Sequence, residues 1–262
     1  MLAADFQQLQ QWFVGYVADF KDLDPEGLRN ILLKEVHTLR VVACMEALTA
    51  GEGLDERESL IAATVALLHD VGRFPQYRQW RTFRDSESDN HARLSLEVIR
   101  SERLLEHLPA DEKILIEEAV RFHNLLALPE QIASPTDCYI KLIRDADKLD
   151  IWRVFLEYYQ LPEEQRASAV GLGFPDLPEV TPECLDAFSA GRIVQLDQAR
   201  VLNDFKLLQI SWVYDLNFAT TRRLLLEREY LPKLAATLPD IPSVQQAVER
   251  AVSSLTACSD QA

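Results

Sequence analysis

The sequence predicts an all-α fold. Apolar residues recur at three- and four-residue steps along most of the chain, the alternation typical of strands is nearly absent, and only 8 glycines interrupt 262 residues. Hydrophobic residues make up 48% of the chain, which is enough to bury a full core. We therefore expect a single all-α domain over residues 1–262.

Two predicted helices near the start of the chain carry polar residues on apolar faces. Residues 32–48 repeat apolar side chains at helical spacing, and His37 lies within this stripe. Ser59 is a suitable cap for the next helix, whose run LIAATVALL is apolar enough for a central position. His69 and Asp70 then fall in its last turn, and both helices point a histidine inward.

The next predicted helices are separated by a long polar connection over residues 73–90. Asp89 or Asn90 can cap a helix that begins near His91 and ends at about residue 108, before a proline. A further helix over residues 111–128 places His123 on the same face as its apolar residues. His123 is thus a further inward histidine.

A fifth helix is predicted from residue 136 to beyond residue 152, with Asp147 inside its apolar stripe. Removal of a carboxylate from water costs several kcal/mol unless a cation or several donors compensate. Asp147 therefore requires a partner. Asp145 lies about 200° around the helix and is the poorer candidate.

Together these residues predict a metal site. Imidazole and carboxylate groups are the donors that Zn, Mn, Fe, Co and Ni accept, and a site that activates water needs several of them from different elements. Taken singly, an inward histidine is more often a hydrogen-bonded core residue. The joint pattern favours metal binding by His37, His69, Asp70, His91, His123 and Asp147.

The segments around these residues resemble the HD-domain superfamily of metal-dependent phosphohydrolases. The matching segments are EVHTLRV at His37, ALLHDVGRF at His69 and Asp70, and RDADKLD at Asp147. DNHARLSLEVI and RFHN resemble the extra ligands of members that hold two metal ions. The resemblance covers residues 30–155, and it implies an HD-domain helical bundle followed by a helical C-terminal extension over residues 156–262.

The resemblance also implies roles for these residues. His37, His69, Asp70 and Asp147 would hold one divalent transition metal ion, and His91 and His123 would complete a second site with Asp70 as the bridge. The catalytic residues would then be Asp70, His91 and His123. If only one ion binds, His91 and His123 are candidates for an acid/base pair, because imidazole titrates near neutral pH.

Basic and aromatic residues interleave in the connection between the His-Asp pair and His91. Guanidinium groups bind phosphate oxygens and aromatic rings stack on bases, so this segment is a candidate substrate loop or lid. Lys148, beside the last ligand, is a further candidate phosphate contact. In the alternative interpretation the arginines pair with nearby acids and the aromatics cover the surface. The predicted substrate-binding residues are Arg73, Arg78, Arg81, Arg84 and Lys148.

Charge and composition narrow the class of partner. The chain has 27 basic and 42 acidic residues, a net charge of −15, so its field repels nucleic acid and anionic membrane surfaces. No apolar run reaches about 18 residues and the start resembles no secretory signal. The four cysteines form no CxxC pair, which is typical of reduced thiols. We expect a cytoplasmic protein.

In the C-terminal region the sequence predicts a connection interrupted by proline and glycine, then helix from about residue 185 to 238. A short amphipathic helix is predicted after Pro242. Its aromatic residues are more often core than a cofactor site, and they are also candidates for contacts of a homodimer. These aromatic residues are Phe205, Trp212, Tyr214 and Phe218.

Three functions follow from the resemblance, and the first is favoured. It is metal-dependent hydrolysis of a phosphate ester in a small molecule, with nucleotides as the candidate class. The second is an HD-type di-iron oxygenase, which uses a similar ligand arrangement. The third is a ligand-sensing domain without turnover, which ranks below the others because all six ligand positions are occupied by suitable residues.

Overall fold

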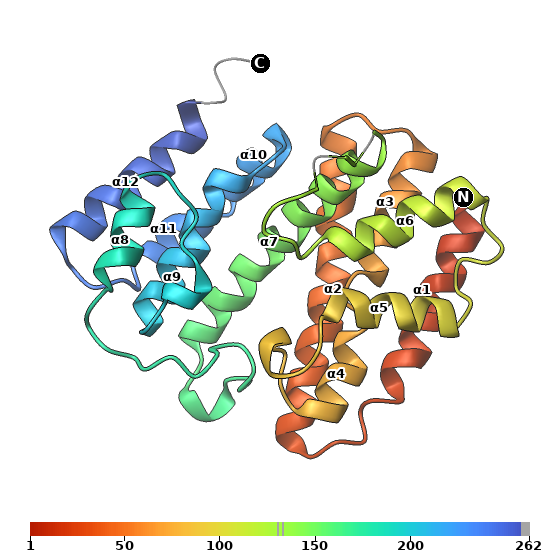
Figure 1. The fold of residues 1–262 in the computed structure, drawn as a ribbon, viewed down its shortest axis with the longest axis horizontal. Coiled ribbons are helices and arrows are strands. Elements are labelled where there is room, and N and C mark those ends of the chain that lie inside the picture. The colour runs from red at the N-terminus through yellow and green to blue at the C-terminus, as the bar shows by residue number, and fades with distance from the viewer. Residues whose placement is uncertain (130, 133, 258–262) are drawn as a thin grey trace. The chain divides into compact units, whose positions relative to one another are not determined.

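The computed structural model describes residues 1–129, 131–132 and 134–257. These residues form helices and loops and contain no strand, which confirms the predicted all-α fold (Figure 1). The chain divides into two compact units, the first made of Met1–Ile151 with Ala167–Val170 and the second of Trp152–Arg166 with Gly171–Ala262. The division lies close to the expected end of the core at residue 155. That the two units fold as a single domain stays a prediction.

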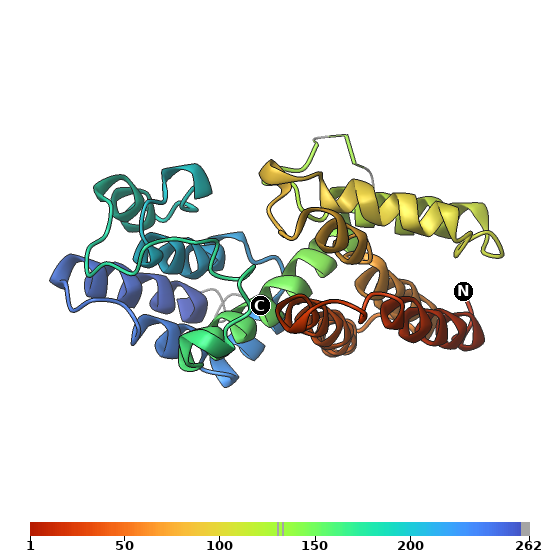
Figure 2. The ribbon, with the colours of Figure 1, turned by 90° about the horizontal axis from the view of Figure 1, so that it is seen from below.

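The first unit is built around α3. This helix contacts α1, α2 and α6, while α5 packs on α6 and on α4. In Figure 2 the α5–α6 pair (yellow) lies on one side of this unit and α1 (dark red) on the other, with the orange helices between them. The helices are α1 (Ala3–Ala18), α2 (Pro25–Gly51), α3 (Glu56–Leu68), α4 (Arg73–Trp80), η1 (Asp85–Glu87), α5 (His91–Ser101), α6 (Ala110–Phe122) and the first part of α7 (Thr136–Gln160).

Side-chain caps fix where three of these helices begin. Asp24 accepts a hydrogen bond from the amide of Gly27 (2.9 Å) at the start of α2. Asn90, one of the two caps that the sequence predicted, accepts one from the amide of Arg93 (3.0 Å) at the start of α5. The predicted cap of α3 was wrong. Asp55 caps it instead, because its carboxylate and that of Glu58 each bind the other residue's amide.

The connection over residues 73–90 differs from the predicted irregular segment. Residues 73–80 form α4, and a left-handed Arg81 (φ 58°) ends this helix. The two following helices are shorter than predicted. α5 stops at Ser101, because the chain turns through a left-handed Arg103, and α6 stops at Phe122. His123 therefore lies just beyond the end of its helix.

The second unit contains the end of α7 and the helices that follow it. The indole nitrogen of Trp152 donates a hydrogen bond to the carbonyl of Gln209 (3.0 Å), and Phe205 packs edge-on against Phe155. Phe205 is therefore a core residue, as predicted, whereas Trp212, Tyr214 and Phe218 are half-buried. The elements are η2 (Glu163–Gln165), α8 (Pro182–Ser189), η3 (Leu196–Gln198), α9 (Leu202–Ser211), η4 (Trp212–Asp215), α10 (Ala219–Glu227), α11 (Tyr230–Ala235) and α12 (Pro242–Ala257).

Two further findings concern disulfide bonds and membrane-spanning helices. Cys44, Cys138 and Cys184 form no disulfide among the described residues, and Cys258 lies outside them. Among the described helices, none combines the length and the apolar character that a membrane crossing requires.

Candidate metal centre

The His-Asp pair lies where α3 ends and approaches the start of α5. His69 is the C-terminal cap of α3, and the chain turns sharply through Asp70 to Gly72. A Cβ atom on Gly72 would lie 2.3 Å from the backbone nitrogen of Ser95, so only glycine permits this approach. The hydroxyl of Ser95 accepts from the amide of Gly72 (2.9 Å) and donates to the carbonyl of His69 (2.7 Å). These two hydrogen bonds of Ser95 hold Asp70 beside His91.

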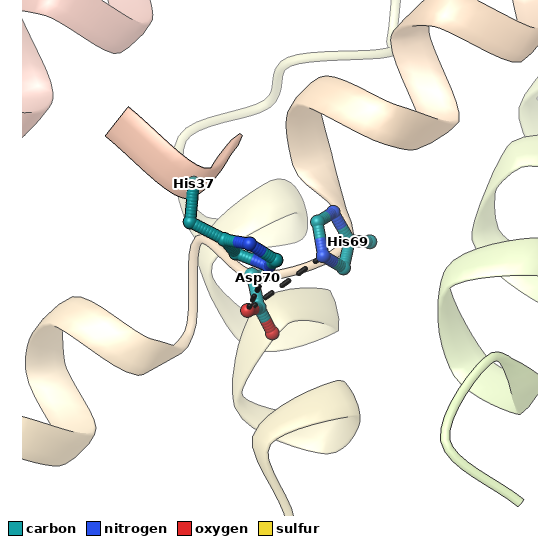
Figure 3. A group of neighbouring side chains, drawn as sticks. All are labelled: His37, His69 and Asp70. Atoms are coloured by element: carbon teal, nitrogen blue, oxygen red, sulfur yellow. Dashed lines mark ion pairs between the residues drawn. The ribbon is translucent and has the colours of Figure 1, made fainter. Parts of the chain in front are cut away.

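The first cluster consists of His37, His69, Asp70 and Asp147. Figure 3 shows the rings of His37 and His69 directed at the Asp70 carboxylate. Their Nε2 atoms lie 3.7 and 3.6 Å from Oδ2 of Asp70. Oδ1 of Asp147 lies 3.0 Å from Nε2 of His37 and 3.7 Å from Nε2 of His69. Four predicted ligands from α2, α7 and the end of α3 therefore converge.

The second cluster consists of Asp70, His91 and His123. Nε2 of His91 lies 3.1 Å from Nε2 of His123 and 3.8 Å from Oδ1 of Asp70. One ligand atom from each of these residues lies within 4.8 Å of the others, as is also true of His37, His69 and Asp70. Oδ2 of Asp70 faces the first cluster and Oδ1 faces the second. Asp70 is therefore shared by both groups.

All four histidines are held by their Nδ1 atoms, which leaves Nε2 for the interior of the site. Nδ1 of His37 lies 2.7 Å from Asp150, and Nδ1 of His91 lies 2.6 Å from Asp85. A second partner at the outer ring nitrogen is typical of metal-binding histidines, because it fixes the tautomer and the orientation of the ring. The backbone carbonyls of Ala66 and Val120 play this part for His69 and His123, each at 2.7 Å.

Three buried atoms at the first cluster make no hydrogen bond of suitable geometry with the described residues, although two of them lie 3.0 Å apart. They are Nε2 of His37, Nε2 of His69 and Oδ1 of Asp147. A buried polar group without a partner costs about 1–3 kcal/mol. A divalent cation held by these nitrogen and oxygen atoms would satisfy all three, so the donor set fits a transition metal ion.

Comparison with known proteins agrees with this geometry. The family model of the HD domain matches residues 35–152, the part of the chain that contains all six predicted ligands. These residues belong to the HD-domain superfamily. Neither the comparison with curated proteins nor the comparison with solved structures found a match.

The carboxylates of the HD domain are held in their charged form. Burial raises the pKa of Asp70, but the charges of Lys34, His69 and Arg73 outweigh it and hold that pKa well below 3.8. Burial also raises the pKa of Asp147, and contacts with His37 and His69 lower it well below 3.8. Both carboxylates are therefore ionised at neutral pH, as metal ligands must be.

The histidines differ in their electrostatic surroundings. Burial and the charge of Lys34 lower the pKa of His37, but its contacts with Asp147 and Asp150 prevail and raise it above 6.5. Burial, followed by the charge of His91 and then His69, lowers the pKa of His123 from 6.5 to about 3. Burial and Arg73 likewise lower the pKa of His91.

The lowered pKa values of His91 and His123 bear on whether these residues act as an acid/base pair. His91 and His123 are neutral at neutral pH, so they carry lone pairs for a metal and lack the proton that a general acid donates. These pKa directions agree with the ligand role and count against a general-acid role, while a neutral imidazole is still able to act as a general base. The catalytic roles of Asp70, His91 and His123 stay predictions.

Two cations flank the shared carboxylate of the HD domain. Nζ of Lys34 lies 2.7 Å from Oδ2 of Asp70, and Nε of Arg73 lies 3.5 Å from Oδ1. Nε of Arg73 is buried without a hydrogen-bond partner among the described residues. Both cations lie over the ring of Phe83, at 5.5 and 5.9 Å from its centroid. The sequence predicted Arg73 as a substrate contact but missed Lys34.

The three other predicted arginines pair with acidic residues that are not among the predicted metal ligands. Arg78 pairs with Asp22, Arg81 with Asp24, and Arg84 with Glu87. Lys148 is 9% exposed on α7. The ion pairs agree with the alternative interpretation of this segment, and a substrate role for these four residues stays a prediction.

Sequence reasoning also missed the carboxylates behind the histidines. Asp150 and Asp85 are 113 and 6 residues from the rings that they hold. Asp150 has a signal in the sequence, because it lies three residues after Asp147 and shares its helix face. Asp85 has none, because it is one of several acids in a polar segment.

Proposed function

We propose that this protein is a metal-dependent phosphohydrolase that cleaves a phosphate ester of a small molecule, with nucleotides as the first class to test. The observation that carries the proposal is Asp70, whose two carboxylate oxygens each face a separate cluster of histidines. The family supports the same function, because HD domains are in general metal-dependent phosphohydrolases.

In this proposal His37, His69, Asp70 and Asp147 hold one divalent ion, and Asp70, His91 and His123 hold a second. The mixed nitrogen and oxygen donors are compatible with Mn, Fe, Co, Ni or Zn. Bound divalent ions lower the pKa of coordinated water and neutralise charge on phosphoryl oxygens.

The chain itself supplies two cations for the phosphate group. Lys34 and Arg73 are 15% and 14% exposed, which places them between the buried ligands and solvent. Ammonium and guanidinium groups form charge-assisted hydrogen bonds with phosphate oxygens. Asp70 holds both cations in place, and in the proposal they bind and orient the phosphate of the substrate.

The direct test is phosphate release by the protein loaded with Mn²⁺, Co²⁺ or, under nitrogen, Fe²⁺. The substrates are nucleoside monophosphates and sugar phosphates. We expect release that a chelator abolishes and that His69→Ala removes, while the exposed His107 (42% exposed) serves as the control in His107→Ala. Oxygen uptake that requires iron would replace the proposal with the oxygenase function. Binding of a nucleotide without its consumption by the metal-loaded protein would favour a sensing domain.

A further inference from the structure

The four histidines of the site obtain their outer partners in two different ways. His69 and His123 each cap the end of a helix, where carbonyls of the last turn have no amide partner within the helix. Their Nδ1 atoms bind the carbonyls three residues earlier, those of Ala66 and Val120. The end of the helix therefore orients these two rings.

His91 has no such carbonyl available. It is the first residue of α5, so the residue three positions earlier lies outside the helix. Its outer partner is a side chain, Asp85, whose Oδ2 atom lies 2.6 Å from Nδ1 of His91. The orientation of this ligand depends on a single carboxylate.

Asp85 is itself braced from the other side. Its Oδ1 atom accepts hydrogen bonds from Nη1 of Arg73 (2.9 Å) and Nε2 of Gln76 (3.1 Å). Gln76 is fully buried and also donates to Ser88 (2.8 Å) and to the carbonyl of Asp89 (2.9 Å). Oδ1 thus anchors Asp85 to α4, and Oδ2 is directed at His91.

We infer that Asp85 is a positioning residue that determines whether the second cluster holds a metal ion. The inference rests on the proposed two-metal centre. A carboxylate at the outer nitrogen orients the ring and raises its basicity, and loss of such a partner typically lowers metal affinity or activity about 10- to 100-fold. The first cluster has its own carboxylate partner, Asp150, on a different helix. Loss of Asp85 should therefore affect one ion and spare the other.

The test compares Asp85→Ala with Asp89→Ala. The two carboxylates lie in the same segment with 32% and 30% exposure, but Asp89 pairs with Arg93 on the surface. Mn²⁺ or Co²⁺ is titrated into metal-free protein against a competing chelator. We expect two ions in the wild type and in Asp89→Ala, and a second ion bound about 10- to 100-fold more weakly in Asp85→Ala. If Asp85→Ala does not fold, Asp85→Asn is used in its place, because asparagine is close to aspartate in size. The same weakening of the second ion is expected.

A double variant distinguishes positioning from a general structural role. If Asp85 acts through His91, then Asp85→Ala combined with His91→Ala binds metal as His91→Ala alone does. Further loss in the double variant would overturn the inference. So would unchanged affinity in Asp85→Ala, equal weakening of both ions, or a wild type that binds fewer than two ions. Phosphate release by the wild type is a separate measurement, so two bound ions without hydrolysis would refute the proposed function and leave the role of Asp85 intact.

Discussion

Nδ1 of His37 lies 2.7 Å from Oδ2 of Asp150, and both side chains are 2% exposed. His37 lies in the middle of α2, where the backbone carbonyls accept the amides of the helix itself. A carboxylate from α7 supplies the partner instead. The contact turns Nε2 of His37 toward Asp147, three residues before Asp150 on the same helix.

Asp150→Ala should weaken metal binding at the first cluster by about 10- to 100-fold, because the ring of His37 loses its orienting partner. The measurement is the same chelator competition. Asp137→Ala, a substitution at a surface ion pair with Lys141 on the same helix, is the control and should leave both affinities unchanged. Equal affinities in Asp150→Ala and the wild type would contradict this role.

His69→Ala should lower metal affinity and phosphate release more than Asp150→Ala does. Asp150→Ala removes only the partner of a histidine, whereas His69→Ala removes a predicted ligand that lies beside Asp70 and Asp147. Removal of the imidazole also leaves a cavity at a fully buried position, which lowers stability. Thermal unfolding of the variant is therefore measured as well. His107→Ala, at an exposed histidine, should change neither. A His69→Ala protein that folds and keeps its metal content would exclude His69 from the site.

Lys34→Gln should weaken the binding of inorganic phosphate to the metal-loaded protein by roughly tenfold, the effect of one charge-assisted hydrogen bond. Calorimetry measures the affinity. Lys21→Gln, at a lysine paired with Glu35, is the control and should bind phosphate as the wild type does. If Lys34→Gln shows wild-type affinity, Lys34 does not contact the phosphate group.

The buried state of His123 predicts a pH dependence of stability in the metal-free protein. Its pKa is about 3 when folded and 6.5 when unfolded, so between these values the unfolded chain binds a proton that the folded chain does not. The free energy of unfolding therefore falls as pH falls through this window, with no loss from this group above it.

His123→Gln removes the titrating group. Urea unfolding between about pH 6.5 and 4.5 should then show a smaller dependence of stability on pH, by up to about 1.4 kcal/mol per pH unit. An unchanged dependence would mean that His123 is protonated in the folded protein. The ligand role favoured here would then lose its electrostatic support.

The main helices of the HD domain could be predicted from local patterns. Apolar spacing around His37 and in the run before His69 predicted α2 and α3, and the polar residues inside those patterns predicted which side chains converge. Ends of helices were less predictable. Asp55 rather than Ser59 caps α3, and α5 ends early at the left-handed turn of Arg103. These ends were mispredicted because side-chain caps and left-handed turns have little effect on the spacing of apolar residues.

The partners behind the ligands could not be predicted in the same way. Asp85 and Lys34 are ordinary members of a chain with 42 acidic and 27 basic residues. Their contacts with His91 and Asp70 depend on tertiary packing, namely the close approach of Gly72 to α5 and the anchoring of Asp85 by Arg73. Helix periodicity carries no information about such contacts.

Anomalous diffraction from crystals grown with Mn²⁺ shows directly whether two metal sites share Asp70. We expect two anomalous peaks, one between Asp70 and the His37–His69 pair and one between Asp70 and the His91–His123 pair. Crystals of protein with bound Mn²⁺ whose peaks lie elsewhere, or the absence of any peak beside Asp70, would contradict the shared role of Asp70.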